Sequence, residues 1–344
     1  MAEKPIIKVG KGSAVPSSLP VRQLSPISGK RVLVTGAAGF LGSHLCRRLE
    51  SAGACVYGVT RRPAPGSAGT RRWIQADCSN PQELRSTLRQ VQPQVIYHLS
   101  GSSVGSPDLE AVLPTLQSDL VACINLLTVA AEIGCERIVL AASLEEPTPP
   151  NDLPASPYAA AKWCCSTYAR MFHRLFNAPV SLVRPYMTYG PGQRPHKIIP
   201  SVIISILEGR APELGGGRRP VDWVYVDDVV EGMIAVAETS RLEGVTIDLG
   251  SGASVTIREV VNRIVALMGG QIEPRFGVLP DRPFEVIRIA DLASAQELLG
   301  WRPKTPLEAG LRQTIEWYRN EILRGREPGS AISTQGRESI KAAS

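Results

Sequence analysis

The amino-acid sequence predicts an α/β protein in which a doubly wound parallel sheet is followed by a smaller C-terminal α/β domain. Between residues 31 and 140, short apolar runs rich in β-branched residues alternate with stretches in which apolar residues recur three and four apart. This alternation is typical of parallel strands joined by helices. The first such unit, residues 31–50, carries three glycines between its strand and its helix.

The composition excludes several classes of protein. The 344 residues are 43% hydrophobic and 20% charged, with a net charge of +6, which is ordinary for a globular protein. Lys and Arg are dispersed without aromatic interleaving, so no nucleic-acid partner is expected. Neither a run of about 18 apolar residues nor a secretory signal is present, so we expect a cytoplasmic protein outside the membrane. Seven cysteines without C-x-x-C spacing and four scattered histidines predict reduced thiols and no metal site.

The glycine-rich turn predicts a dinucleotide site in a Rossmann-type fold. It reads Gly-x-x-Gly-x-x-Gly, with Gly36, Gly39 and Gly42. In such folds the first glycine makes a tight turn, the second lets the backbone approach a pyrophosphate, and the third lets helix and strand pack closely. The N–H groups of the helix start, at Phe40 and Leu41, would face the phosphates. Three glycines could also form a simple turn, but the flanking strand and helix favour the cofactor site.

The other elements follow along the chain. Strands are expected at 55–60, 73–75, 94–99, 137–142, 180–184 and 245–249. Helices are expected at 81–90, 119–134, 197–207, 226–237 and 257–268, and a further helix is expected to begin at 156–162. Asp227 and Asp228 are expected to cap the helix at 226–237. We divide the chain into a flexible arm (1–29), a dinucleotide-binding Rossmann domain (30–185, joined again by about 220–255), a mainly substrate-binding domain (186–322) and a polar tail (323–344).

The end of the second strand indicates which dinucleotide is bound. NAD sites usually carry an acidic side chain here, which accepts hydrogen bonds from the ribose 2′-hydroxyl. This chain has Thr60, Arg61 and Arg62 instead, and guanidinium groups suit a 2′-phosphate. The expected cofactor is therefore NAD(P), with NADP slightly favoured over NAD, although the two arginines could also simply begin a solvated loop.

Two further segments are expected at the cofactor. Asp77, beside Cys78 after the third strand, is placed to accept a hydrogen bond from the adenine amino group; alternatively, it lies in the N-terminal region of the next helix. Leu99, Ser100 and Gly101 end the fourth strand, where a loop of small residues would let the chain pass under the cofactor.

A candidate catalytic set follows the fifth strand. Ser143 ends that strand at the carboxyl edge of the sheet, where ligands of such folds bind. Tyr158 and Lys162 are four residues apart and share one helix face. A nearby ammonium group is expected to lower the pKa of a phenol from about 10 toward neutrality. The phenol could then exchange a proton with a substrate hydroxyl while nicotinamide exchanges a hydride with the same carbon. Tyr-x-x-x-Lys also occurs on ordinary exposed helix faces, so its interpretation depends on the glycine turn and Ser143.

These motifs resemble those of the extended short-chain dehydrogenases/reductases of the nucleotide-sugar epimerase/dehydratase group. The resemblance covers roughly residues 30–322 and includes segments 184–195, 222–229 and 299–311. It implies a nucleotide-diphosphate-sugar substrate bound by a small C-terminal domain over the carboxyl edge of the sheet. It also implies a homodimer built on the helices near 119–133 and 157–176. Lys162 would hold the nicotinamide ribose, and Ser143 would orient the substrate oxygen.

The resemblance also points to substrate ligands. Arg282 matches a family arginine that meets the pyrophosphate, and Arg194 could reach a phosphate or a sugar substituent, although both could be ordinary surface arginines. Met187 stands where many relatives place Asn or Thr. Val221 stands where many place a phosphate-binding arginine, a role that Arg219 or its neighbour could take over.

The loop after the fifth strand departs from the family pattern. Glu145 occupies the place of a glutamate that handles the C5 proton in sugar 4,6-dehydratases, but Leu144 replaces its usual acidic or polar neighbour. Glu145 could equally be a structural loop acid. Three functions remain open: an epimerase or dehydratase acting by hydride transfer at C4 of a nucleotide-activated hexose, an NADPH-dependent reductase of a nucleotide-linked 4-keto sugar, and a non-catalytic dinucleotide-binding protein. The first is preferred, and the intact catalytic set weighs against the third.

Overall fold

The centre of the protein is a seven-stranded sheet. The computed structural model describes residues 26–63, 70–102, 105, 107–148, 152–281 and 287–325. All strands of the sheet are parallel, in the order β11-β6-β5-β4-β1-β2-β3. They are β1 (Arg31–Thr35), β2 (Cys55–Thr60), β3 (Arg72–Gln75), β4 (Val95–His98), β5 (Arg137–Ala141), β6 (Val180–Pro185) and β11 (Thr246–Leu249). The chain winds one way from β1 and the other way from β4, so a crevice opens between them at the carboxyl edge. The predicted doubly wound sheet is confirmed.

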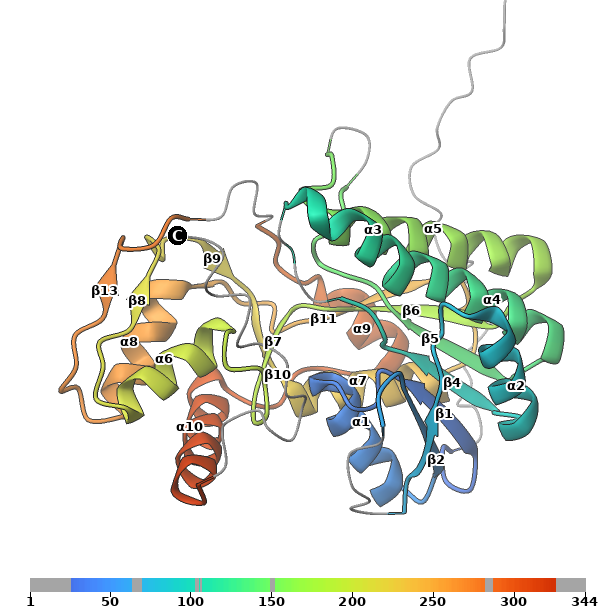
Figure 1. Cartoon of the computed structure of the whole chain (residues 1–344), viewed down its shortest axis with the longest axis horizontal. Coiled ribbons are helices and arrows are strands. Elements are labelled where there is room, and N and C mark those ends of the chain that lie inside the picture. The colour runs from blue at the N-terminus through green and yellow to red at the C-terminus, as the bar shows by residue number, and fades with distance from the viewer. Residues whose placement is uncertain are drawn as a thin grey trace, which may run out of the picture.

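Helices cover both faces of this sheet (Figure 1). One face carries α2 (Pro81–Val91), α4 (Ala122–Ile133) and α5 (Pro157–Phe176), and the other carries α1 (Phe40–Ser51), α7 (Val226–Glu238) and α9 (Leu292–Leu299). The strands are continuous apolar runs because both of their faces are buried; Val32, Leu33 and Val34 have no exposed surface.

Local sequence explains where α5 begins and ends. The Ser156 hydroxyl oxygen accepts a hydrogen bond from the N–H of Ala159 at 3.1 Å, and Pro157 occupies the first helical position, where its missing N–H costs nothing. The helix ends at Asn177, which adopts the left-handed conformation with φ of 52°. These signals fix the register of α5 and therefore the direction in which Tyr158 and Lys162 point.

One helical run departs from regular geometry. It comprises the 3₁₀-helix η1 (Leu109–Ala111), α3 (Val112–Thr115), the π-helix η2 (Leu116–Val121) and α4. The run is long and apolar enough to cross a membrane by length and composition, which is weak evidence for a span. Here η2 packs against α5, and α4 packs against α2 and α5, as expected of a core helix.

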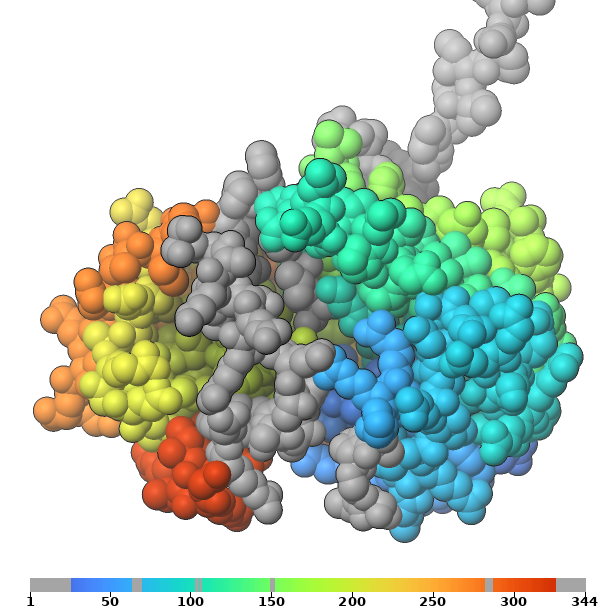
Figure 2. Space-filling view, in the orientation of Figure 1, coloured from blue at the N-terminus to red at the C-terminus, as the bar shows by residue number. Residues whose placement is uncertain are grey.

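The second half of the chain forms a separate hydrophobic cluster. It contains three small sheets, pairing β7 (Met187–Tyr189) with β10 (Trp223–Tyr225), β9 (Pro220–Val221) with β12 (Val255–Thr256), and β8 (Glu213–Leu214) with β13 (Arg275–Phe276). The helices are α6 (Ile198–Leu207), α8 (Ile257–Leu267) and α10 (Leu307–Leu323). In Figures 1 and 2 these yellow to red elements lie beside the seven-stranded sheet and its helices. Residues 1–25 and 326–344, most of the predicted arm and tail, lie outside the described residues.

The prediction that two aspartates cap α7 is wrong. The residue before that helix is Tyr225, which makes no side-chain capping bond. Asp227 is hydrogen-bonded to His44 of α1 at 3.0 Å instead. Asp228 accepts hydrogen bonds from the backbone N–H groups of Lys304 and Thr305. Both carboxylates therefore join distant segments, a use that local spacing does not reveal.

Candidate active site

The glycine turn interlocks with the loop after β4. Gly36 has φ of +69°, and a Cβ atom there would lie 2.8 Å from the backbone of Leu99. The Thr35 hydroxyl accepts hydrogen bonds from the N–H groups of Leu99 and Ser100, both at 3.2 Å. A Cβ atom at Gly42 would overlap the Gly36 carbonyl oxygen. The residues predicted at the cofactor from these two segments therefore lie together, between β1 and β4.

The start of α1 suits a phosphate group. Gly39 precedes the helix and has no side chain with which to cap it, and Phe40 and Leu41 form the first turn. The first N–H groups of a helix lack intrahelical acceptors and carry the positive end of the helix dipole. These residues therefore fit the diphosphate of a dinucleotide.

The strand ends on the β2–β3 side hold the other predicted cofactor residues. Arg61 and Arg62 follow β2 on the exposed surface, and the Thr60 hydroxyl accepts from the backbone N–H of Arg62 at 3.3 Å. Asp77 accepts two hydrogen bonds from Ser79, from its backbone N–H at 2.9 Å and its hydroxyl at 2.8 Å. Asp77 thus lies in the turn before α2, and its contact with the adenine amino group stays a prediction.

Cys78 follows the third strand in the chain and contacts the loop after β4. Burial raises the pKa of its thiol to about 11, although its hydrogen bond with Ser100 acts in the opposite direction. The structure thus brings Cys78 and Ser100 into contact. Gly101, the next residue, has φ of +146°.

The predicted catalytic residues lie together. Ser143 follows β5 and is buried, and its side chain is hydrogen-bonded to Tyr158 in the first turn of α5. The Lys162 ammonium group donates a hydrogen bond to the Ala141 carbonyl oxygen at 3.0 Å. Its nitrogen lies 6.0 Å from the centre of the Tyr158 ring. Three groups from two elements therefore meet at the carboxyl edge of the sheet.

The prediction that the pKa of Tyr158 is lowered is wrong. Burial raises the pKa of Tyr158 above its ordinary value, and the opposing effects of the Lys162 charge and the Ser143 hydrogen bond are smaller. Burial disfavours the charged form of Lys162 as well, but Tyr158 and Asp119 outweigh it and raise the pKa of Lys162. The sequence argument considered the neighbouring charge and omitted the cost of desolvating a phenolate.

Two glutamates follow Ser143, and they differ in burial. The backbone N–H of Glu145 donates to the Ser143 hydroxyl oxygen at 3.2 Å, and the Glu145 carboxylate lies close to Gly105. Glu146 is buried, and one carboxylate oxygen accepts from the Ser143 N–H at 2.8 Å and the Ser166 hydroxyl at 2.9 Å. Burial raises the pKa of Glu146. Sequence reasoning missed Glu146, although an acid so close to the end of a buried strand was an available signal.

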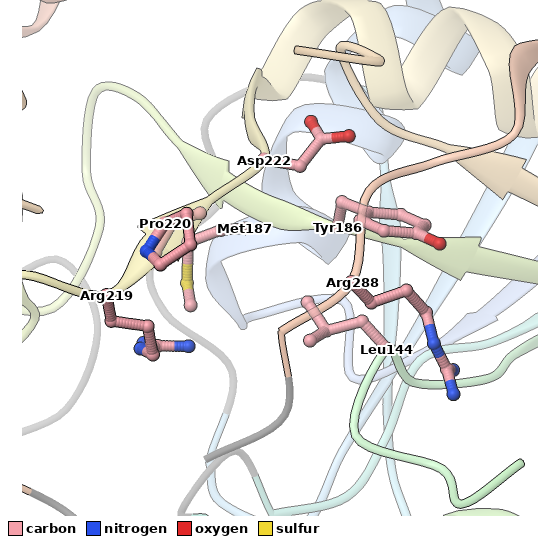
Figure 3. A pocket seen from close by; sticks show the side chains of 8 residues that line it. Leu144, Tyr186, Met187, Arg219, Pro220, Asp222 and Arg288 are labelled. Atoms are coloured by element: carbon pink, nitrogen blue, oxygen red, sulfur yellow. The ribbon is translucent and has the colours of Figure 1, made fainter. Parts of the chain in front are cut away.

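A narrow pocket lies next to Ser143 (Figure 3). Its lining side chains are Leu144, Tyr186, Met187, Arg219, Pro220, Val221, Asp222 and Arg288. Figure 3 shows Arg219 toward one end and Leu144 with Arg288 toward the other. Arg288 donates hydrogen bonds to the Glu146 carbonyl oxygen and the Thr148 hydroxyl, so it braces the loop that carries Ser143.

The predicted substrate residues are distributed unevenly around this pocket. Met187 and Arg219 line it, whereas Arg194 is exposed in the turn before α6 and is not among the lining residues. Arg282 lies outside the described residues. Sequence reasoning missed Tyr186 and Arg288, which face the pocket because β6 and the chain before α9 meet there. Among the described residues, no group of His, Cys, Asp or Glu could hold a metal ion, and all seven cysteines are free thiols.

Comparison with known proteins identifies the family. Residues 32–250 match the NAD dependent epimerase/dehydratase family. The chain belongs to this family. It is 30% identical to the UDP-glucose 4-epimerase of Mycolicibacterium smegmatis, over 85% of this chain and 99% of that protein. It is 27% identical to a dTDP-4-dehydro-6-deoxy-D-allose reductase of a Streptomyces species, over 85% of this chain and 97% of that protein.

A protein of known structure has the same fold. The structure of MoeE5 in complex with UDP-glucuronic acid and NAD superimposes with a TM-score of 0.76 and 32% identity, covering 84% of this chain and 99% of that chain. The protein is therefore an NAD(P)-dependent enzyme of the extended short-chain dehydrogenase/reductase type, in the group that acts on nucleotide sugars.

Proposed function

We propose that the enzyme inverts C4 of a nucleotide-activated hexose by removing and returning a hydride. The observation that carries this proposal is the meeting of Ser143, Tyr158 and Lys162 at the carboxyl edge of the sheet. The glycine turn follows β1 at the same edge of the sheet, and Leu144, the residue next to Ser143, lines the pocket of Figure 3. A dinucleotide and a sugar bound in these two places would meet at Tyr158.

The proposed roles follow from the chemistry of each side chain. The cofactor, when bound, supplies a hydride acceptor at its nicotinamide ring. Tyr158, as the phenolate, would take the proton from the C4 hydroxyl and, as the phenol, would return it. Ser143 would orient the C4 oxygen by a hydrogen bond, and Lys162 would hold the phenolate and the nicotinamide ribose. Met187 and Arg219 would contact the sugar and its diphosphate, and Arg194 and Arg282 remain proposed phosphate ligands.

The residue next to Ser143 favours epimerisation over elimination of water. Leu144 lines the pocket and has no proton to give to a leaving C6 hydroxyl. Glu145 is the remaining candidate for proton exchange at C5, and elimination would require it. Within this first candidate function, we therefore place epimerisation ahead of dehydration.

We propose that Thr60, Arg61 and Arg62 bind the adenosine ribose and favour NADP over NAD. The support is the exposed position of both arginines at the end of β2, where a guanidinium group can pair with a 2′-phosphate. Because the solved relative MoeE5 contains NAD, both dinucleotides must be compared. Replacing both arginines by Ala should weaken NADP binding far more than NAD binding; an equal effect on the two would contradict this assignment.

The reaction is tested in two steps. The purified protein is first denatured, and any released dinucleotide is identified by mass spectrometry. The protein is then incubated with UDP-glucose, UDP-glucuronic acid or dTDP-glucose, and the sugar is followed by NMR. A C4 epimer formed without net consumption of dinucleotide supports the proposal, whereas a 4-keto-6-deoxy product would assign a dehydratase.

A reductase is the second candidate. The Arg61–Arg62 pair and the similarity to a nucleotide-sugar reductase favour it. Stoichiometric oxidation of NADPH by a nucleotide-linked 4-keto sugar, with no epimerase activity, would establish this reaction instead. Binding of dinucleotide without turnover of any sugar would favour the non-catalytic alternative.

We further propose a cytoplasmic homodimer, without membrane or nucleic-acid partners. The support is exposed apolar surface on the layer formed by η2 and α5, where Leu116, Tyr168, Leu175 and Phe176 face solvent. Burying such side chains between two copies is favourable. Light scattering should give twice the chain mass, and Leu175→Asp with Phe176→Asp should give the monomer. The division at residue 185 into cofactor and substrate domains is likewise a proposal, testable by limited proteolysis.

A further inference from the structure

A buried carboxyl group closes the turn that carries Ser143. Residues 143–146, here called the Ser143 turn, follow β5, and the Glu146 N–H donates to the Ser143 carbonyl oxygen at 3.2 Å. The Glu146 side chain returns to the start of this turn, and the residue is only 3% exposed. Burying a carboxyl group is costly unless hydrogen bonds compensate for it. The partners of Glu146 therefore indicate what this side chain holds in place.

The first partner of the carboxylate is the backbone of Ser143. The Ala142 N–H still donates to β6, to the Val183 carbonyl oxygen at 2.8 Å. The next N–H, that of Ser143, donates instead to Oε1 of Glu146 at 2.8 Å. A buried backbone N–H needs an acceptor, and beyond the end of the strand a side chain of the same turn provides it. The N–H and the carbonyl oxygen of Ser143 are thus both bonded to Glu146.

The second partner of the carboxylate lies in α5. Oε1 of Glu146 also accepts a hydrogen bond from the Ser166 hydroxyl at 2.9 Å, and Ser166 has no exposed surface. Ser166 follows Lys162 by four residues and Tyr158 by eight, so the three positions share one face of the helix. One oxygen atom therefore joins the backbone of Ser143 to the helix that carries Tyr158 and Lys162.

The Ser143 turn is also held from the side of the pocket. The Arg288 guanidinium group donates to the Glu146 carbonyl oxygen at 3.0 Å. Within the turn, the Ser143 hydroxyl oxygen accepts from the Glu145 N–H at 3.2 Å, and the same side chain is hydrogen-bonded to Tyr158. Because Glu146 bonds both backbone polar groups of Ser143, the direction of the Ser143 hydroxyl depends on Glu146.

We propose that Glu146 is a positioning residue for Ser143. Its carboxyl group fixes the backbone of Ser143 relative to α5, so that the Ser143 hydroxyl stays within reach of Tyr158 and of the substrate oxygen. Glu146 itself does not touch the reacting atoms and acts only through Ser143. The catalytic consequence rests on the proposed function of Ser143, whereas the anchoring of the turn does not require turnover.

Three variants and a control separate anchoring from general stability. Glu146→Ala removes the acceptor, and Glu146→Gln keeps an acceptor oxygen. Ser166→Ala removes the link to α5 but leaves the acceptor of the Ser143 N–H. Glu136→Gln is the matched control, because the Glu136 carboxylate accepts from Lys30 at 2.7 Å at the opposite end of β5. Circular dichroism establishes that each variant is folded, and Ser166→Ala keeps the proposal testable if Glu146→Ala is not.

The anchoring is tested by amide hydrogen exchange without substrate. Fragmentation mass spectrometry of the segment 140–148 resolves the Ser143 N–H. This N–H should exchange about tenfold faster or more in Glu146→Ala, because it loses its acceptor. Its exchange should stay slow in Glu146→Gln and in the Glu136→Gln control. Equal exchange in Glu146→Ala and the natural protein would overturn the proposed anchoring.

The catalytic consequence is tested by steady-state kinetics with a nucleotide sugar that the enzyme converts. Glu146→Ala should lower kcat about tenfold or more, because a small misplacement of a reacting group has effects of up to about 100-fold. KM and dinucleotide affinity should stay within about threefold, since the lost effect belongs to the transition state. Ser166→Ala should lower kcat less, and Glu146→Gln should restore most of it. An unchanged kcat in both Glu146→Ala and Ser166→Ala, or an equal loss in Glu136→Gln, would overturn the proposal.

A double variant decides whether Glu146 acts through Ser143. In a Ser143→Ala background, Glu146→Ala should change kcat by less than about twofold, because the group that it positions is already absent. Additive losses would show that Glu146 acts by another route and would overturn the proposal. Failure to convert any nucleotide sugar would refute the proposed function, while the exchange of the Ser143 N–H would still decide the anchoring.

Discussion

The Tyr158 hydroxyl is hydrogen-bonded to Ser143 and lies beside the Lys162 ammonium group, so it can exchange a proton with a bound alcohol. Tyr158→Phe removes this proton and little volume. We expect turnover to fall about 100-fold or more, the usual size of lost acid–base catalysis, with dinucleotide affinity nearly unchanged. Steady-state kinetics and cofactor titration measure the two quantities. Tyr168→Phe, an exposed position on the same helix, is the control. Full turnover in Tyr158→Phe would contradict the proposed role of Tyr158 in proton exchange.

Glu146 gives the protein a pH-dependent stability. Burial raises the pKa of Glu146, so the folded state holds this proton more tightly than the unfolded chain does. Its contribution is therefore complete below the unfolded pKa, near pH 4, and is lost as the pH rises through the folded value. Glu146→Gln keeps an oxygen acceptor for Ser143 and Ser166 and does not titrate.

Urea unfolding at several pH values tests this prediction. The variant should gain stability relative to the natural protein as the pH rises from about 4 to 7. A constant difference between the two proteins across that range would mean that the titration of Glu146 makes no contribution.

The residues that the sequence predicted and those that it missed differ in how they reach the site. Ser143, Tyr158 and Lys162 stand at fixed positions relative to one strand end and one helix start, and such spacing can be read from the chain. Asp119 and Arg288 belong to elements that are distant in sequence from Ser143 and Tyr158, and only tertiary packing places them near the site. The direction of the Tyr158 pKa shift was mispredicted for the same reason, because burial is a property of the fold.

Among the elements, the glycine turn and α1 depend on a close backbone approach. A Cβ atom at Gly42 would overlap the Gly36 carbonyl oxygen, whereas one at Gly39 would lie 3.1 Å from the same atom. Gly42→Ala should therefore displace α1 from β1, lower stability by about 2 kcal/mol or more and abolish tight dinucleotide binding. Gly39→Ala should have the smaller effect on stability. Thermal unfolding and cofactor titration measure both; equal loss of stability in the two variants would contradict this reasoning.

Elements with strong local signals were predicted closely, and those without were not. The strand expected at 55–60 is β2, and the helix expected at 81–90 is α2, which Asn80 and Pro81 start. The strands β8, β9, β12 and β13 have two residues each, which is too short to show an alternation of apolar and polar side chains. They are defined only by their backbone pairing with a neighbouring strand. The helix expected from residue 119 is the end of a longer helical run that begins at residue 109. This run includes a π-helical segment, which the sequence pattern did not predict.

At the scale of the molecule, the alternation of strands and helices is sufficient to predict the large sheet, because parallel strands need long crossovers and a fixed hand. The junction with the second half depends instead on single buried polar groups. Asp222, before β10, accepts hydrogen bonds from the N–H groups of Ser251 at 2.6 Å, Gly252 at 3.1 Å and Ala290 at 2.9 Å. One carboxylate thereby joins the loop after β11 to the chain entering α9.

Replacing Asp222 should loosen this junction and the pocket together. Asp222→Ala would leave three backbone N–H groups without their acceptor, at about 1–3 kcal/mol each when buried. Asp291→Ala is the control, because it removes one helix cap that contributes about 1 kcal/mol. We expect Asp222→Ala to lower the free energy of unfolding several times more than this control does. Because Asp222 also lines the pocket, KM for the nucleotide sugar should rise while dinucleotide affinity is retained. Equal destabilisation by the two substitutions, or loss of dinucleotide binding with unchanged KM, would show that the junction is held elsewhere.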